Sequence, residues 1–133
     1  MSDYNGFTGQ QRTKALRWLN REYAEGRRVR PTSCDGCGQA AGVIQAHSED
    51  YSEPFGDHIG RFSFCYRCHM MLHCRLRAPE AWERYKAAIV AGVAFAPFLR
   101  RNWFGFRAQH LTGWAPALGA PGPTRSDMLS RIG

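Results

Sequence analysis

The sequence lacks any segment that would place the protein in or across a membrane. It contains no run of about 18 or more consecutive apolar residues, the length that a membrane-spanning helix needs. Its first ten residues are mostly polar and lack the charged and apolar regions of a secretory signal peptide. We therefore expect no membrane partner and a cytoplasmic protein, in which thiols stay reduced and disulfides are uncommon.

Lysine is also scarce, although the chain is strongly basic. The 133 residues carry a net charge of +7, and only Lys14 and Lys86 among the 18 basic residues are lysine. The others are arginine, whose planar guanidinium grips phosphate through two hydrogen bonds and stacks on bases. A basic surface attracts nucleic acid through the release of counterions. The composition therefore favours a nucleic-acid partner, although the same charge could serve solubility alone.

Apolar spacing and helix-ending residues predict an α+β fold. A helix is expected from Thr8 to Glu25, with Leu16, Leu19 and Tyr23 on one face and Gly26 at its end. Short strands are expected over 43–47 and 60–64, followed by a helix from Cys65 to about Arg75. A further helix over 80–91 begins behind Pro79 and turns Trp82, Tyr85 and Ile89 toward the core.

The length suits a single domain, which we divide into four segments. They are an N-terminal helix and basic linker (1–33), a core with all five cysteines (34–78), a C-terminal helix with an aromatic, basic extension (79–114) and a flexible tail rich in Pro, Gly and Ala (115–133). A chain of this size buries only a small core. A bound metal would therefore add stability that packing alone does not supply.

Four of the cysteines form two pairs with the spacing of a metal site. Two residues separate Cys34 from Cys37 and Cys65 from Cys68, and residues 38–64 lie between the pairs. Two such pairs complete the tetrahedral sulfur site that zinc prefers. Two unrelated buried pairs, or a redox Cys-x-x-Cys, would not explain two copies in so short a chain. We predict a structural Zn²⁺ site, and a buried apolar role for Cys74.

Three histidines form a second constellation beside the cysteines. His69 and His73 are four residues apart, so both imidazoles lie on one face of the predicted helix. His47 lies at the end of the first predicted strand. If strand and helix pack side by side, three nitrogens converge and leave coordination positions open, as in a catalytic metal site.

The runs AHSEDYSEP (46–54) and FCYRCHMMLH (64–73), with the first cysteine pair, resemble the zinc-containing HNH endonucleases of phages and bacteria. That family carries Cys-x-x-Cys, then His-His-x-Asp-Tyr-x-x-Pro, then Cys-x-x-Cys-His-x-x-x-His. The resemblance covers residues 34–73. It implies a ββα-metal core braced by the four-cysteine zinc site, with His47, His69 and His73 around a catalytic Mg²⁺, Mn²⁺, Ni²⁺ or Zn²⁺. The implied activity is hydrolysis of DNA phosphodiester bonds.

Position 48 departs from the family pattern. The paired family histidines correspond here to His47 and Ser48, so serine stands where the resemblance places the general base. A serine hydroxyl does not accept a proton near neutral pH. Three alternatives stay open. His47 could be the base with the register moved by one residue, His58 could swing in from the loop, or the metal alone could activate water.

Arginines and aromatic residues supply candidate surfaces for partners. We assign nucleic-acid contacts to arginines in or next to the core segment: Arg27, Arg28, Arg30, Arg61, Arg67, Arg75 and Arg77. Residues 95–107 interleave five aromatic side chains with three arginines, a composition that suits stacking on unpaired bases, a protein partner or the core. Cleavage of both DNA strands would be compatible with a homodimer.

These patterns leave three hypotheses for function. The first is a metal-dependent HNH-type endonuclease with His47 and His58 as candidate catalytic residues. The second is a catalytically degenerate HNH or zinc-ribbon module that binds nucleic acid or a protein without cleaving, and the third is a structural zinc protein in a larger assembly.

Overall fold

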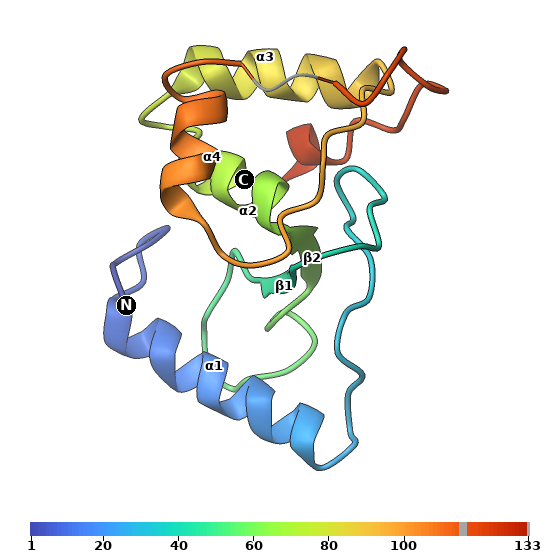
Figure 1. Ribbon diagram of the computed structural model, residues 1–133. Coiled ribbons are helices and arrows are strands. Elements are labelled where there is room, and N and C mark those ends of the chain that lie inside the picture. Colours follow the sequence, from blue (N-terminus) through green and yellow to red (C-terminus); the bar gives the residue numbers. More distant parts are fainter. Residues whose placement is uncertain (115–116, 133) are drawn as a thin grey trace.

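The computed structural model describes residues 1–114 and 117–132, and the chain has an α+β fold with four α-helices and one two-stranded sheet (Figure 1). The elements in chain order are α1 (Gly9–Ala24), β1 (Ile44–His47), β2 (Phe62–Cys65), α2 (Tyr66–His73), α3 (Pro79–Val90), α4 (Trp103–His110) and the short 3₁₀ helix η1 (Leu129–Arg131). None of the described helices combines the length and apolarity that crossing a membrane would require.

Helix α1 forms where the sequence predicts it, because both of its ends are capped. The Thr8 hydroxyl accepts a hydrogen bond from the Gln11 amide, and the Gln11 side chain accepts one from the Thr8 amide. Gly26 follows the helix with φ +75°, which glycine adopts without strain. The buried face differs from the prediction: Leu16 is 42% exposed, whereas Arg12 is only 8% exposed.

The sheet is an antiparallel pair that leads directly into α2. Ile44 pairs with Cys65 and His47 pairs with Phe62, so the start of β1 faces the end of β2. Helix α2 begins at the next residue, Tyr66, and packs against both strands. This arrangement holds the end of β1 beside the first turns of α2.

Most of the core lies between α2, α3, α4 and the C-terminal residues. As predicted, Trp82, Tyr85 and Ile89 are buried along one face of α3, and Cys74 is buried as well. Helix α1 lies on the other side of the sheet from α3 (Figure 1). A smaller apolar cluster of Ala15, Leu19 and Ile59 attaches it to the loop between the strands.

The C-terminal segment differs from the flexible tail expected from its composition. The Arg125 amide donates to the Val90 carbonyl at 2.9 Å, and the Arg125 side chain donates to the Val93 carbonyl at 2.8 Å. Leu129 and Ile132 are buried in the main core. Residues 115, 116 and 133 of the expected tail lie outside the described residues. The described part of the segment therefore completes the core.

Candidate metal centres

The first candidate centre joins the four paired cysteines. Cys34 and Cys37 lie in the turns before β1, and Cys65 and Cys68 lie at the junction of β2 and α2. Their sulfur atoms all lie within 4.8 Å of one another. Cys37 Sγ is 3.8 Å from Cys65 Sγ, which matches the edge of about 3.8 Å that a tetrahedron with Zn–S bonds of about 2.3 Å would have. The group could hold a structural metal such as zinc.

Backbone geometry supports each cysteine pair. The Cys37 amide points at Cys34 Sγ, and the Cys68 amide points at Cys65 Sγ, each at 3.5 Å. Gly36 is needed because a Cβ atom there would lie 2.9 Å from the Leu129 side chain and 3.1 Å from Cys68 Sγ. The C-terminal residues therefore pack directly against the cysteine site.

The four thiols differ in how readily they lose a proton. Hydrogen bonds from Cys37, Cys65 and Cys68 hold the pKa of the Cys34 thiol far below its ordinary value. Burial raises the pKa of the Cys68 thiol, which also lies 3.0 Å from the Tyr85 hydroxyl of α3. A divalent cation would supply the positive charge that lets all four sulfurs be thiolates, so the donor set fits a metal.

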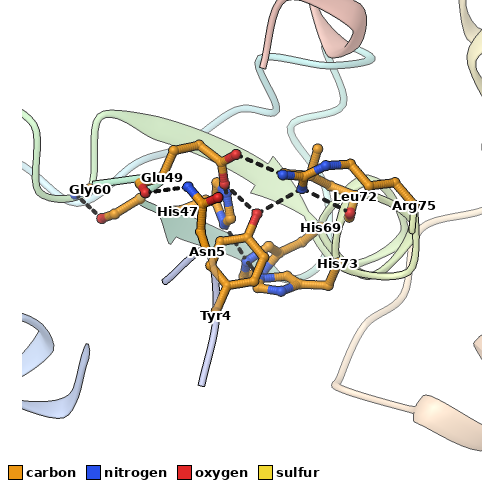
Figure 2. Close-up of polar contacts among 10 residues, drawn as sticks. Tyr4, Asn5, His47, Glu49, Gly60, His69, Leu72, His73 and Arg75 are labelled. Atoms are coloured by element: carbon orange, nitrogen blue, oxygen red, sulfur yellow. Dashed lines mark hydrogen bonds and ion pairs between the residues drawn. The ribbon is translucent and has the colours of Figure 1, made fainter. Parts of the chain in front are cut away.

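The second candidate centre joins the three histidines, which come from β1 and α2 (Figure 2). His47 Nδ1 lies 3.1 Å from His69 Nε2, and His73 Nε2 lies 3.0 Å from the same atom. Ligand nitrogens around a tetrahedral ion with bonds of about 2.0–2.1 Å would be about 3.3 Å apart. The three rings therefore converge at nearly the spacing of metal ligands, as the sequence predicts.

The hydrogen bonds of the outer ring nitrogens explain why a cation fits between the inner ones. His47 Nε2 donates to Glu49 Oε2 at 2.7 Å, and His69 Nδ1 donates to Gln45 Oε1 at 2.8 Å. A neutral imidazole carries one proton, so with these outer contacts each ring in its neutral form would present a lone pair at its inner nitrogen. Lone pairs facing each other at 3.1 Å repel unless a cation lies between them. The same outer-nitrogen contacts orient histidine ligands in metal proteins.

Burial also keeps the histidines in the form that binds metal. Burial lowers the pKa of His69 well below its ordinary value, and the neighbouring His73, His47 and Arg12 lower it further. Burial and neighbouring positive charge lower the pKa of His73 to about 3. These two imidazoles are therefore neutral near pH 7, as a ligand must be.

Glu49 is the centre of a polar network that the sequence analysis missed (Figure 2). Its carboxylate accepts hydrogen bonds from His47, from the Tyr4 hydroxyl and from Arg75. Burial would raise the pKa of Glu49, but the hydrogen bonds from His47 and Tyr4 outweigh it, and the pKa lies below its usual value. Continuing the alternation of β1 two residues past its end could have indicated Glu49, because residues two apart in an extended chain share a face. No local signal indicates Tyr4, which is 45 positions away from Glu49.

Neither of the other candidate proton acceptors lies free at the histidines. Ser48 is buried, and its hydroxyl accepts a hydrogen bond from the Gly60 amide at 2.6 Å. His58 Nε2 lies 2.7 Å from the Ser52 carbonyl, within the loop between the strands. His58 is not part of the group formed by His47, His69 and His73. Ser48 therefore has a structural partner, and His58 is held apart from the cluster.

Some of the seven arginines chosen from the sequence have structural contacts. Arg67 is buried, donates to Gln109 Oε1 at 2.6 Å and to the Ala96 carbonyl at 2.7 Å, and lies inside the protein, away from any macromolecular ligand. Arg28 donates to the Ile59 carbonyl at 2.5 Å and so ties the basic linker to the loop.

The remaining arginines are closer to solvent. Arg27 forms ion pairs with Glu22 and Glu25, and Arg75 holds Glu49. Arg30, Arg61 and Arg77 are exposed. Of these three, Arg30 lies over the Tyr23 ring, 4.8 Å from its centroid.

The two candidate centres share helix α2 and the two-stranded sheet that leads into it. Cys65 ends β2, Cys68 and His69 are adjacent in the first turn of α2, and His47 ends β1. A metal at the cysteines would therefore fix the strand and helix that carry the histidines. Comparisons with protein-family models, curated proteins and solved structures found no match to this chain.

Proposed function

We propose that the protein is a metal-dependent endonuclease of the HNH type that hydrolyses DNA phosphodiester bonds. The observation that carries the proposal is the convergence of His47 Nδ1, His69 Nε2 and His73 Nε2 on one point. Three protein ligands with open positions are typical of catalytic rather than structural ions. The net charge of +7 suits a polyanionic substrate.

The chain's own residues have distinct roles in this proposal. His47, His69 and His73 would hold Mg²⁺, Mn²⁺, Ni²⁺ or Zn²⁺, and the cysteine site would hold Zn²⁺ as a brace. Glu49 keeps the proton on His47 Nε2, and Gln45 keeps the proton on His69 Nδ1, so both rings present their inner nitrogens. The bound ion would stabilise charge on the scissile phosphate and the leaving oxygen.

The proposal gives the histidines a binding role rather than a proton-transfer role. Both nitrogens of His47 are engaged, one toward Glu49 and one toward His69. Ser48 is bonded to Gly60, and His58 is bonded to Ser52. We therefore expect the His58→Ala variant to retain the activity of the wild type.

Cleavage of plasmid DNA by purified zinc-loaded protein tests the proposal, with each of the four ions supplied in turn. We expect nicked or linear DNA from the wild type, a loss of at least about 100-fold for His69→Ala, and wild-type rates for His58→Ala. The cysteine-bound zinc is measured in each variant to show that the fold is intact. Folded wild type that cleaves no DNA with any ion would rule the proposal out.

The second candidate is a module that binds DNA without cutting it. The bond between Ser48 and Gly60 favours it, because the position of the family's general base then has a structural role. This candidate predicts that His69→Ala leaves the DNA affinity unchanged and that no ion supports cleavage. The affinity should fall steeply with salt in proportion to the phosphates contacted.

A further inference from the structure

Arg12 is a buried arginine without a carboxylate partner. It lies on the inward face of α1 and is 8% exposed. Among residues 1–114 and 117–132, no aspartate or glutamate forms an ion pair with it. Buried charges in proteins are normally paired, because leaving water costs a charged group a large free energy. The position of Arg12 therefore calls for an anion from outside the described chain.

The contacts of Arg12 with neutral groups hold its side chain in place but leave part of its hydrogen-bonding capacity unused. Its Nη1 donates to the Ser2 carbonyl at 2.6 Å. The guanidinium lies against the rings of Tyr4 and Tyr51, 5.1 Å and 5.3 Å from their centroids. Its Nε is buried and has no hydrogen-bond partner among the described residues. The side chain is therefore fixed by its surroundings while donor capacity is left over.

A cavity joins Arg12 to the histidine cluster. This cavity, of about 560 Å³, lies between α1 and the sheet, and Arg12, His47 and His69 all line it. Arg30 and Arg101 line it as well, so three arginines face the same space. A volume of this size is in the range of small-molecule sites and could admit a phosphate group.

Tyr4 links Arg12 to the cluster from the other side. The centroid of its ring lies 4.5 Å from the centroid of the His73 ring. The same centroid lies 5.1 Å from Arg12 Cζ. The guanidinium is therefore close enough to act on a group bound at the histidines.

We propose that Arg12 binds a phosphate group of the substrate in this cavity, beside the metal held by the three histidines. The proposal rests on the proposed function in that the phosphate would belong to DNA. The guanidinium would donate to a phosphate oxygen while Ser2, Tyr4 and Tyr51 keep it in place. Arg12 is then a substrate-binding residue from an element outside residues 34–73.

Binding of inorganic phosphate to zinc-loaded protein tests the proposal directly. The variants are Arg12→Gln, Arg12→Lys and the matched control Arg17→Gln, which removes the same charge from the exposed face of α1. We expect phosphate to raise the Tm of the wild type and of the control. Arg12→Gln should bind phosphate at least about tenfold more weakly, the loss typical of one charged hydrogen bond. Arg12→Lys keeps the charge but loses the planar guanidinium that can donate two hydrogen bonds at once. It should therefore bind phosphate with intermediate affinity.

The outcomes separate this proposal from the endonuclease proposal. Phosphate binding by Arg12→Gln that equals the wild type would overturn the assignment of Arg12, whether or not DNA is cut. Phosphate binding that depends on Arg12, in protein that cleaves no DNA, would support the phosphate site and reject the nuclease. If Arg12→Gln loses its zinc or its fold, Arg12→Lys decides: unchanged phosphate affinity in that variant would overturn the proposal. If the wild type cleaves DNA, the Arg12 variants that bind phosphate more weakly should also show a lower kcat/KM for DNA cleavage.

Discussion

Glu49, two residues beyond the end of β1, accepts a hydrogen bond at its Oε2 from His47 Nε2 at 2.7 Å. This contact sets which nitrogen of His47 faces His69 and His73. Glu49 is in turn held by Arg75, whose Nη2 lies 2.9 Å from Oε1, and by the Tyr4 hydroxyl. The direction of one ring thus depends on residues from the N-terminal segment and from the turn after α2.

Glu49→Gln should weaken metal binding at the histidines. The amide keeps the shape of the carboxylate but removes its charge, so it holds the His47 proton less firmly. We expect the affinity of this site to fall by about 10–100-fold, while the cysteine site keeps its zinc. Titration of Co²⁺ or Zn²⁺ into protein with the cysteine site filled measures the loss.

Glu53→Gln is the matched control for this change. Glu53 lies in the same loop and pairs with Lys14 on the surface, with side chains 57% and 64% exposed. An equal loss of metal affinity in both variants would mean that net charge, rather than the contact with His47, is responsible.

Ser48→Ala should destabilise the protein without weakening either metal site. The Ser48 hydroxyl accepts from the Gly60 amide at 2.6 Å, and alanine leaves that amide without this acceptor. An unsatisfied buried donor costs about 1–3 kcal/mol, and because Gly60 is half-buried the free energy of unfolding should fall by about 1 kcal/mol, the low end of this range. Urea unfolding of metal-loaded protein measures it, with exposed Ser52→Ala as the control. If Ser48→Ala instead abolished DNA cleavage in stable protein, Ser48 would have a chemical role.

Cys37→Ser should lower the zinc content of the protein, whereas Cys74→Ala should leave it unchanged. Cys37 is one of the four grouped sulfurs, whereas Cys74 is buried outside the group. We expect Cys37→Ser to lose about one zinc per chain and to unfold at much lower urea concentration. Cys74→Ala should keep its zinc and lose only packing. Elemental analysis after gel filtration distinguishes them, and a Cys37→Ser protein with unchanged zinc content would contradict the assignment.

The sequence carries enough local information to predict the metal-ligand candidates and most elements. The spacings of Cys34, Cys37, Cys65 and Cys68 are read directly from the sequence. A helix cap such as Thr8 depends only on residues within one helical turn. The α+β class, α3 and the burial of Cys74 follow from the same short-range patterns and are confirmed, whereas the ββα-metal core stays a prediction.

The features that the sequence did not indicate depend on contacts between distant residues. Arg12 is buried because Ser2 and two tyrosine rings surround it, although arginine side chains are mostly exposed. Leu129 packs against Gly36 across more than half of the chain, although its neighbours have the composition of a linker. Tertiary packing overrides composition at both places, which is why local patterns fail there.

His110 should make the stability of the protein depend on pH. It is fully buried, and its Nε2 lies 2.5 Å from Arg67 Nη1, which donates to it. Burial, followed by the positive charge of Arg67, lowers the pKa of His110 to about 3. Between about pH 6.5 and 3 the unfolded chain therefore binds a proton that the folded protein does not, and stability falls as the pH falls through this window.

At pH 5 this effect amounts to about 2 kcal/mol relative to pH 7.5, from about 1.5 pH units at about 1.36 kcal/mol each. The His110→Gln variant can still accept from Arg67 but does not titrate, so it should lose less stability on acidification. Urea unfolding of both proteins at the two pH values, with zinc held at saturation, gives the difference. Acid-labile metal ligands contribute equally to both proteins, so only a smaller loss in His110→Gln supports the role of His110. Equal losses would place the pH dependence at the metal ligands instead.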